Sequence, residues 1–262
     1  MTIGITGGAG FVGGHLTRQL RTLGHRVTVF TRPTAPRGVL SAEDLVGLDV
    51  LIHAAWDFNV VDNRNVADSI RLFEAARAAG MARVVFISTM SAFDGCRSRY
   101  GASKLAVERH AAAMGVCPVR LGFVCADSNG GLSGSLKKLA ALPIVPLPGG
   151  GSQNLYTLDA NDLAPAFLKI IEHYPAEPVN MAYPEPVRLD RLLRCFAQQQ
   201  GRNPFLVPFP WRMLWLPLRA VEAAGIHLKF RSDSLVSLMN QNPAPDFRHL
   251  REWGFQPKMI AC

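Results

Sequence analysis

A tyrosine and a lysine four residues apart, Tyr100 and Lys104, are the side chains of this sequence most suited to chemistry. Residues at this spacing lie one turn apart on one face of a helix, so the ammonium can stand beside the phenol. A free phenol loses its proton at about pH 10, and a neighbouring positive charge favours the ionised form. The pair therefore predicts a tyrosine that acts as a general base, or as a general acid in the reverse direction. An ordinary surface pair on a helix is the alternative.

Three hydroxyl side chains, Ser88, Thr89 and Ser91, come shortly before this pair. They follow residues 83–87, an apolar run typical of a buried parallel strand. In open α/β sheets, ligands bind outside the carboxyl ends of such strands. We therefore expect a hydroxyl from this strand end to bind the substrate oxygen whose proton Tyr100 exchanges.

The element that must position these groups lies at the beginning of the sequence. A short apolar strand runs into a turn whose glycines stand three apart, Gly7, Gly10 and Gly13. Gly7 can adopt the backbone angles of a tight turn, Gly10 lets the main chain approach a pyrophosphate, and Gly13 permits close contact between helix and strand. The anion would then sit at the helix N-terminus, at Phe11 and Val12. A glycine turn without a ligand is the alternative.

The segment Thr6-Gly7-x-x-Gly10-x-x-Gly13, followed by Tyr100-x-x-x-Lys104, resembles short-chain dehydrogenase/reductases, particularly their extended epimerase/dehydratase branch. The resemblance implies an α/β fold: a Rossmann-type doubly wound parallel sheet with a small C-terminal substrate-binding lobe. It also implies a nicotinamide cofactor and hydride transfer at a carbinol or carbonyl carbon. Tyr100 would be the general acid/base, and Lys104 would assist it and contact the cofactor.

Within this resemblance, Thr89 aligns with the catalytic hydroxyl, and Ser88 or Ser91 could substitute for it. Leu121, within the apolar strand expected over residues 117–124, would border the nicotinamide in place of the family's proline. The substrate remains open between a sugar-nucleotide-like or other small hydroxylated compound and an apolar ketone or aldehyde. A dinucleotide-binding sensor or assembly protein without turnover is a further alternative.

The end of the second predicted strand, residues 25–30, indicates which cofactor is bound. In NAD-dependent folds an acidic residue about 20 positions past the glycines binds the ribose 2′-hydroxyl, whereas an arginine accommodates a 2′-phosphate. Here Thr31 and Arg32 occupy this place, with Arg37 close behind. NADP is therefore favoured over NAD, unless Arg32 merely ends the strand in solvent.

Further cofactor contacts are expected after the third apolar run, at His53, Ala54 and Ala55. This segment resembles the strand end that passes beneath the cofactor in the same enzymes. His53 is expected to be packed or bonded to the backbone rather than catalytic. Asn65 matches the asparagine that starts the next helix in the family; a helix N-cap and a role in positioning water or the active-site lysine both remain open.

The composition excludes several other classes. Hydrophobic residues make up 48% of the 262 residues and charged residues 18%, and no run is long enough to span a membrane. The net charge of +8 is spread along the chain rather than clustered, which argues against nucleic-acid binding. We expect a small-molecule substrate and neither nucleic acid nor a membrane as partner.

The cysteines and histidines bear on metal binding and on the cellular compartment. Five scattered cysteines without a Cys-x-x-Cys pair indicate neither a disulfide framework nor a zinc site. The seven histidines show no metal-ligand pairing, so no metal is expected. The first strand begins within a few residues of Met1, which leaves no room for a signal peptide, so a cytoplasmic location fits best.

The chain is expected to divide unequally. Residues 1–124 would form the cofactor-binding core, completed by parts of 152–182, and residues 125–262 would mainly form the substrate lobe. The apolar stretch 205–218 is interrupted by prolines and is predicted to be core. Members of the family commonly form homodimers through the helices expected over 65–79 and 100–114, which the sequence alone does not establish.

Overall fold

The computed structural model describes residues 1–31, 40–58, 63–128, 130–226 and 230–260. Its central element is a six-stranded parallel sheet in the order β10-β5-β4-β3-β1-β2. The strands are β1 (Thr2–Thr6), β2 (Arg26–Phe30), β3 (Val50–His53), β4 (Val84–Thr89), β5 (Cys117–Leu121) and β10 (Val179–Met181). Because the chain moves to β2 on one side of β1 and returns to β3 on the other, the sheet is doubly wound, as predicted.

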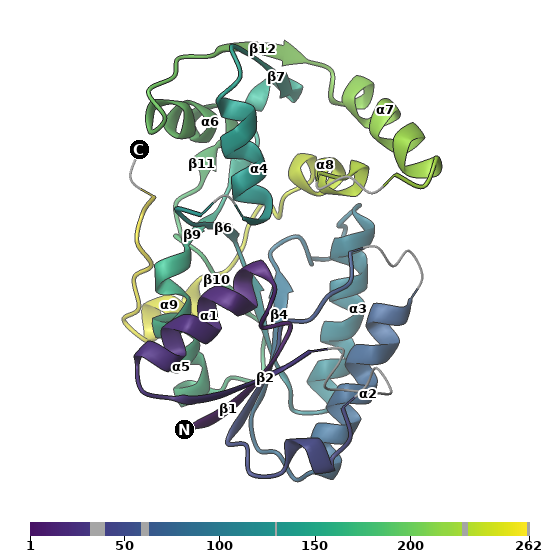
Figure 1. Cartoon of the computed structure of the whole chain (residues 1–262), viewed down its shortest axis with the longest axis vertical. Coiled ribbons are helices and arrows are strands. Elements are labelled where there is room, and N and C mark those ends of the chain that lie inside the picture. Colours follow the sequence, from purple (N-terminus) through teal and green to yellow (C-terminus); the bar gives the residue numbers. More distant parts are fainter. Residues whose placement is uncertain (32–39, 59–62, 129, 227–229, 261–262) are drawn as a thin grey trace.

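Helices cover both faces of this sheet (Figure 1). One face carries α1 (Phe11–Thr22), α5 (Leu163–His173) and α9 (Arg248–Glu252), and the other carries α2 (Arg64–Ala78) and α3 (Arg99–Ala113). Neighbouring strand residues alternate between the two faces: Ile52 packs in the core beneath α1 and α5, whereas Leu51 packs in the core beneath α2 and α3. Burial on both faces explains why the strands read as continuous apolar runs.

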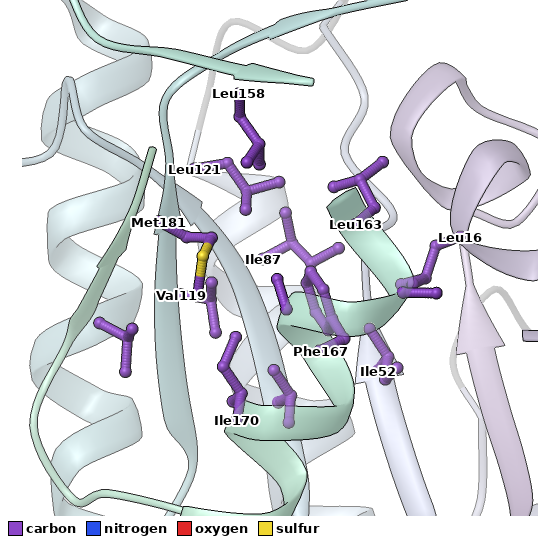
Figure 2. Packing of buried hydrophobic residues seen from close by; sticks show 14 of the residues in the cluster. Leu16, Ile52, Ile87, Val119, Leu121, Leu158, Leu163, Phe167, Ile170 and Met181 are labelled. Atoms are coloured by element: carbon purple, nitrogen blue, oxygen red, sulfur yellow. The ribbon is translucent and has the colours of Figure 1, made fainter. Parts of the chain in front are cut away.

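The apolar core beneath α5 holds β4 and β5 in place, and polar residues of the candidate site lie at the end of β4. Figure 2 shows Phe167 and Ile170 of α5 directed at Ile87 of β4 and Val119 of β5, with Leu16 of α1 alongside. All five side chains are almost fully buried. Burying such side chains stabilises a fold by about 1.5–3 kcal/mol each, so this packing holds the strand ends in register.

A smaller unit, which we call the C-terminal lobe, lies beyond the carboxyl edge of the sheet (Figure 1). It comprises α4 (Gly131–Ala140), α6 (Leu189–Gln198), α7 (Trp211–Ala223), α8 (Ser232–Met239), η3 (Gly149–Gly151) and two small sheets, β7 (Ile144–Pro148) with β12 (Phe205–Phe209) and β8 (Asn154–Leu155) with β11 (Val187–Arg188). The lobe has its own apolar core, centred on α4, α6 and α8.

The chain passes between the sheet and the lobe several times. β6 (Phe123–Cys125) pairs with β9 (Thr157–Asp159), and η4 (Ala160–Asp162) leads from β9 into α5. After α8 the chain returns to the sheet, where Phe247 and Leu250 join its core. The lobe is therefore not one continuous stretch of chain, because α5 and β10 lie between its segments. Between β2 and β3, the described residues hold the short helix η2 (Glu43–Leu45).

The prediction that residues 205–218 form core holds for only one side of this segment. The segment forms β12 and α7, and no residue of α7 is buried among the described residues. Phe205 is 77% exposed, and Met213 and Leu216 are exposed on α7. Trp211, Leu214 and Trp215 pack, partly buried, against the core of the lobe, so only the other side of α7 remains exposed.

Within the described ranges, no helix is long and apolar enough to cross a membrane. The same residues bring together no three His, Cys, Asp or Glu side chains that could hold a metal ion. Cys195 of α6 is disulfide-bonded, which corrects the expectation that the cysteines form no disulfide.

Candidate active site

The glycine turn after β1 has the geometry that the sequence predicts. Gly7 has φ +70°, and a Cβ there would lie 2.5 Å from the backbone nitrogen of Ala55. A Cβ on Gly13 would lie 2.3 Å from the carbonyl oxygen of Gly7, so helix and strand approach more closely than any side chain allows. The Gly10 amide donates to the same carbonyl over 2.9 Å and closes the turn.

The N-terminus of α1 fits a phosphate group. Gly10 is the N-cap residue and has no side chain to cap the helix, and the first turn, residues 11–14, carries no acidic side chain. Backbone amides at such a terminus, together with the helix dipole, attract anions. Phe11 packs against Gly131 at the start of α4, where a Cβ would lie 2.6 Å from its ring. The residues therefore fit the pyrophosphate of a dinucleotide.

The end of β3 is fastened beneath this turn. The amides of Ala54 and Ala55 donate to the carbonyl and hydroxyl oxygens of Thr6, over 3.1 and 3.3 Å. The His53 ring is buried; Nδ1 is 2.7 Å from the Thr6 hydroxyl and Nε2 is 2.9 Å from the Ser69 hydroxyl. Burial, reinforced by the charge of Lys104, lowers the pKa of His53 to about 3. His53 is thus packed, but its ring bonds to side chains rather than to the backbone.

Asn65 does not cap α2. The N-cap residue is Asn63, and Asn65 is the second residue of the helix. Its amide group makes two hydrogen bonds with the backbone of Asp57, accepting from N over 2.9 Å and donating to O over 2.8 Å. The N-cap interpretation is therefore wrong: Asn65 anchors the loop of residues 54–58 that follows β3.

Tyr100 and Lys104 lie in successive turns of α3, which begins at a side-chain cap: the Ser98 hydroxyl accepts from the Gly101 amide over 3.0 Å. Lys104 is buried, and its Nζ donates to the carbonyl of Ile87 over 2.7 Å. The same Nζ lies 5.8 Å from the centre of the Tyr100 ring. The helix thus brings the two side chains together beside the end of β4, as their spacing predicts.

Burial shifts both protonation equilibria toward the neutral forms. It lowers the pKa of Lys104 to about 7, although the Glu108 carboxylate opposes this shift. It raises the pKa of Tyr100 above its ordinary value, and a hydrogen bond with Thr89 only partly offsets this effect. The structure by itself therefore does not shift Tyr100 toward the phenolate, because desolvation outweighs the effect of Thr89.

The three hydroxyls after β4 have different partners. The Thr89 hydroxyl lowers the pKa of the neighbouring Tyr100 phenol, and it accepts from the Ser91 amide over 3.2 Å. Ser88 donates to the buried Glu108 carboxylate, which Arg120 binds through Nε and Nη2. Ser91 accepts from the Ser237 hydroxyl over 2.7 Å. Thr89 is therefore the hydroxyl that the structure brings to the phenol.

Sequence reasoning missed two aromatic side chains beside Tyr100. Trp56 meets the Tyr100 ring edge-on at 5.8 Å between centroids, and its own ring lies 4.0 Å from Lys104 Nζ. Phe58, which is exposed, lies 5.5 Å from the Tyr100 ring. The available signal was a pair of aromatic residues just beyond Ala54 and Ala55, at the carboxyl end of a predicted strand.

The remaining predicted cofactor residues are placed as follows. Leu121 is buried at the end of β5, and its carbonyl accepts from the Met90 amide over 3.0 Å. Thr31 directly follows β2. Arg32 and Arg37, on which the NADP prediction rests, lie outside the described residues.

Known proteins resemble this chain in sequence and in fold. A 25% identical relative is an uncharacterized protein of Mycobacterium tuberculosis (strain ATCC 25618 / H37Rv); the match covers 98% of this chain but only 28% of that protein. DesIV, a dTDP-glucose 4,6-dehydratase from Streptomyces venezuelae solved with NAD bound, has a TM-score of 0.71 at 19% identity, covering 99% of this chain and 92% of its own. TunA, an NAD-dependent NDP-hexosamine 5,6-dehydratase involved in tunicamycin biosynthesis, has a TM-score of 0.68 at 22% identity. The match covers 80% of this chain and 84% of TunA.

At these identities the solved structures establish the fold alone. The sequence match to a family model is more informative, because it covers residues 3–183, more than half of the chain. That match begins in β1 and ends just after β10, so it includes the glycine turn, the end of β4 and the Tyr100 helix. The chain belongs to the NAD dependent epimerase/dehydratase family.

Proposed function

We propose that this chain is a nicotinamide-dinucleotide-dependent enzyme that transfers a hydride at a carbinol or carbonyl carbon. The observation that carries the proposal is the grouping of Tyr100, Thr89 and Lys104 at the carboxyl edge of the sheet, where the glycine turn also lies. A matched acid/base pair beside a phosphate-binding turn serves catalysis, whereas a sensor that only binds a dinucleotide does not need it.

In this proposal the N-terminus of α1, at Phe11 and Val12, holds the pyrophosphate, and Ala54, Ala55 and Leu121 line the cofactor. The bound nicotinamide supplies or accepts the hydride. Thr89 binds the substrate oxygen, and Tyr100 gives it a proton in the reducing direction. In the oxidising direction Tyr100 removes that proton, for which it must reach the phenolate.

Lys104 helps Tyr100 in both directions. With a pKa of about 7, its ammonium is available at neutral pH and stands next to the phenol. When protonated, it stabilises the phenolate electrostatically, because a charge pair in a buried site is weakly screened. Trp56 covers the ammonium from one side and excludes water from it.

The substrate is proposed to be a small hydroxylated compound of the sugar-nucleotide kind. The support is that TunA and DesIV are named as dehydratases of nucleotide sugars. A second candidate is an apolar ketone or aldehyde. Trp56 and Phe58 favour it because they present aromatic surface beside Tyr100. Gln153 of the lobe, which donates to Pro148 O over 2.9 Å, would offer a diphosphate no positive charge.

The decisive experiment incubates the chain with NADP⁺, NADPH, NAD⁺ or NADH and a panel of nucleotide sugars, alcohols and carbonyls, following the nicotinamide absorbance. Tyr100→Phe should lower turnover by a factor of about 10²–10⁴ and leave dinucleotide affinity unchanged. Tyr156→Phe is the control, because its ring packs against Phe247 near α9. Dinucleotide binding without turnover of any compound would favour the sensor, and undiminished turnover in Tyr100→Phe would remove the phenol from the mechanism.

The NADP preference is tested separately by calorimetry. If Arg32 binds a 2′-phosphate, NADPH binds more tightly than NADH, and Arg32→Ala removes the difference while NADH affinity stays the same. Tighter binding of NADH by the unaltered chain would contradict this assignment.

A further inference from the structure

The first turn of α3 is held by a carboxylate from the C-terminal lobe. Asp233, in the first turn of α8, accepts from the Arg99 amide through Oδ1 over 2.8 Å and from the Tyr100 amide through Oδ2 over 2.9 Å. A carboxylate at a helix N-terminus gains both from charge-assisted hydrogen bonds and from the helix dipole. One of the two donors is the backbone of the tyrosine itself.

A second contact lies one turn further along α8. The Ser237 hydroxyl donates to Ser91 Oγ over 2.7 Å, and the Ser91 amide in turn donates to the Thr89 hydroxyl over 3.2 Å. Asp233 and Ser237 are four residues apart and share a face of α8. Figure 1 shows α8 lying across the end of α3 nearest the lobe. One face of one helix thus contacts both the backbone of Tyr100 and the loop that follows Thr89.

Asp233 is not needed to cap its own helix. The N-terminus of α8 is already bound by Glu222 of α7, whose carboxylate accepts from the Ser232 amide over 2.7 Å and from the Ser232 hydroxyl over 2.6 Å. Ser98 similarly provides the side-chain cap of α3 at the Gly101 amide. The contact between Asp233 and α3 therefore adds to the hydrogen bonds of Glu222 and Ser98, and it joins two parts of the fold 134 residues apart in sequence.

We propose that Asp233 and Ser237 form a clamp with which the C-terminal lobe positions Tyr100 relative to Thr89 for catalysis. The proposal rests on the proposed function, because it concerns the same phenol. Reacting groups must be held closely in register, and a displacement of about 1 Å can lower a rate about 10²-fold. Asp233 and Ser237 are positioning residues: they act through the backbone at Tyr100 and the loop at Ser91.

The test compares Asp233→Ala with Asp190→Ala. Asp190 is a matched control, because it is also a first-turn carboxylate of the lobe, and it accepts from the Arg191 amide in α6 over 2.8 Å. Two quantities are measured in the full chain: hydrogen exchange of the peptide that contains Arg99 and Tyr100, and the kinetic constants for the best compound of the substrate panel.

Asp233→Ala should speed exchange at these amides at least tenfold and lower kcat about tenfold or more, with an unchanged KM for the dinucleotide. Asp233→Asn, which keeps one oxygen acceptor, should recover part of kcat, and Ser237→Ala should lower kcat less than Asp233→Ala. Asp190→Ala should change neither quantity.

Three results would count against the clamp. Unchanged exchange in Asp233→Ala would mean that the contact does not order α3, and faster exchange with an unchanged kcat would reduce Asp233 to a structural cap. If Asp190→Ala lowered kcat as much as Asp233→Ala does, general destabilisation of the lobe would explain the lower kcat of both variants. Undiminished turnover in Tyr100→Phe would reject the proposed function itself, whereas a normal kcat in Asp233→Ala beside an impaired Tyr100→Phe would reject the clamp alone.

Discussion

The central sheet and the C-terminal lobe are built in different ways. Strands β1, β3, β4 and β5 are buried on both faces, and their ends carry the glycine turn and Thr89. The lobe has short elements around a small core, and its helix α7 has no buried residue in the part of the chain that is described. The sheet and its flanking helices thus carry the residues of the proposed site, whereas the lobe contacts them through Asp233 and Ser237.

Substituting matched glycines should show the largest difference between the two regions. Gly7→Ala should cost about 4 kcal/mol or more, because the new Cβ meets the Ala55 backbone and the residue keeps a left-handed φ. Gly201→Ala in the lobe shares the left-handed φ, but nothing lies within 4 Å of its Cβ, so it should cost only about 1–2 kcal/mol. Chemical denaturation measures the free energy of unfolding of both variants. Equal losses of stability would contradict the expected difference between the sheet and the lobe.

The next largest difference between the two regions is expected in how much their ion pairs stabilise the fold. Glu108 is 3% exposed and binds Arg120 and Ser88, so Glu108→Gln should lower the free energy of unfolding by about 3 kcal/mol. Arg188 of the lobe is 47% exposed and pairs with Asp190, so Arg188→Gln should change it by about 0.5 kcal/mol or less. A loss at Arg188 as large as that at Glu108 would contradict the assignment of buried polar structure to the sheet.

Acid should destabilise the sheet through His53. Its pKa is about 3 in the folded chain and 6.5 ordinarily, so between these values the unfolded chain binds more protons. The free energy of unfolding should therefore fall as pH drops from 6.5 toward 3, by up to about 1.4 kcal/mol per pH unit from this group. Denaturation curves at several pH values measure the slope; His53→Gln should flatten it, and replacing the exposed His110 with Gln should not. An unchanged slope in His53→Gln would show that the ring titrates normally.

The smallest effect is expected on α7. Leu216 is 61% exposed, so Leu216→Gln should alter the free energy of unfolding by about 0.5 kcal/mol or less. Leu193→Ala, in the buried core of the same lobe, should cost about 2–5 kcal/mol. If Leu216→Gln destabilised the chain by more than about 2 kcal/mol, α7 would be packed in solution against surface that this structure leaves exposed.

The sequence predicted the parts of the molecule that follow local rules. Apolar runs identified the buried strands, the spacing of Gly7 and Gly13 identified the turn, and the spacing of Tyr100 and Lys104 placed both on one helix. Contacts between distant segments were beyond its reach: Asp233 meets Tyr100 across more than 130 residues. Burial is also not readable from the sequence: a spacing of four residues reveals the ammonium beside Tyr100 but not the desolvation that raises the pKa of its phenol.

In the proposed function, the glycine turn contacts the pyrophosphate of one bound dinucleotide and Tyr100 lies beside its nicotinamide. A crystal structure of the chain with a bound nicotinamide dinucleotide tests it most directly. We expect the pyrophosphate on the amides at the start of α1 and the nicotinamide beside Tyr100 and Thr89, with room for one substrate carbon and its oxygen. A nicotinamide ring bound away from the Tyr100 phenol would contradict the proposed role of Tyr100 in hydride transfer.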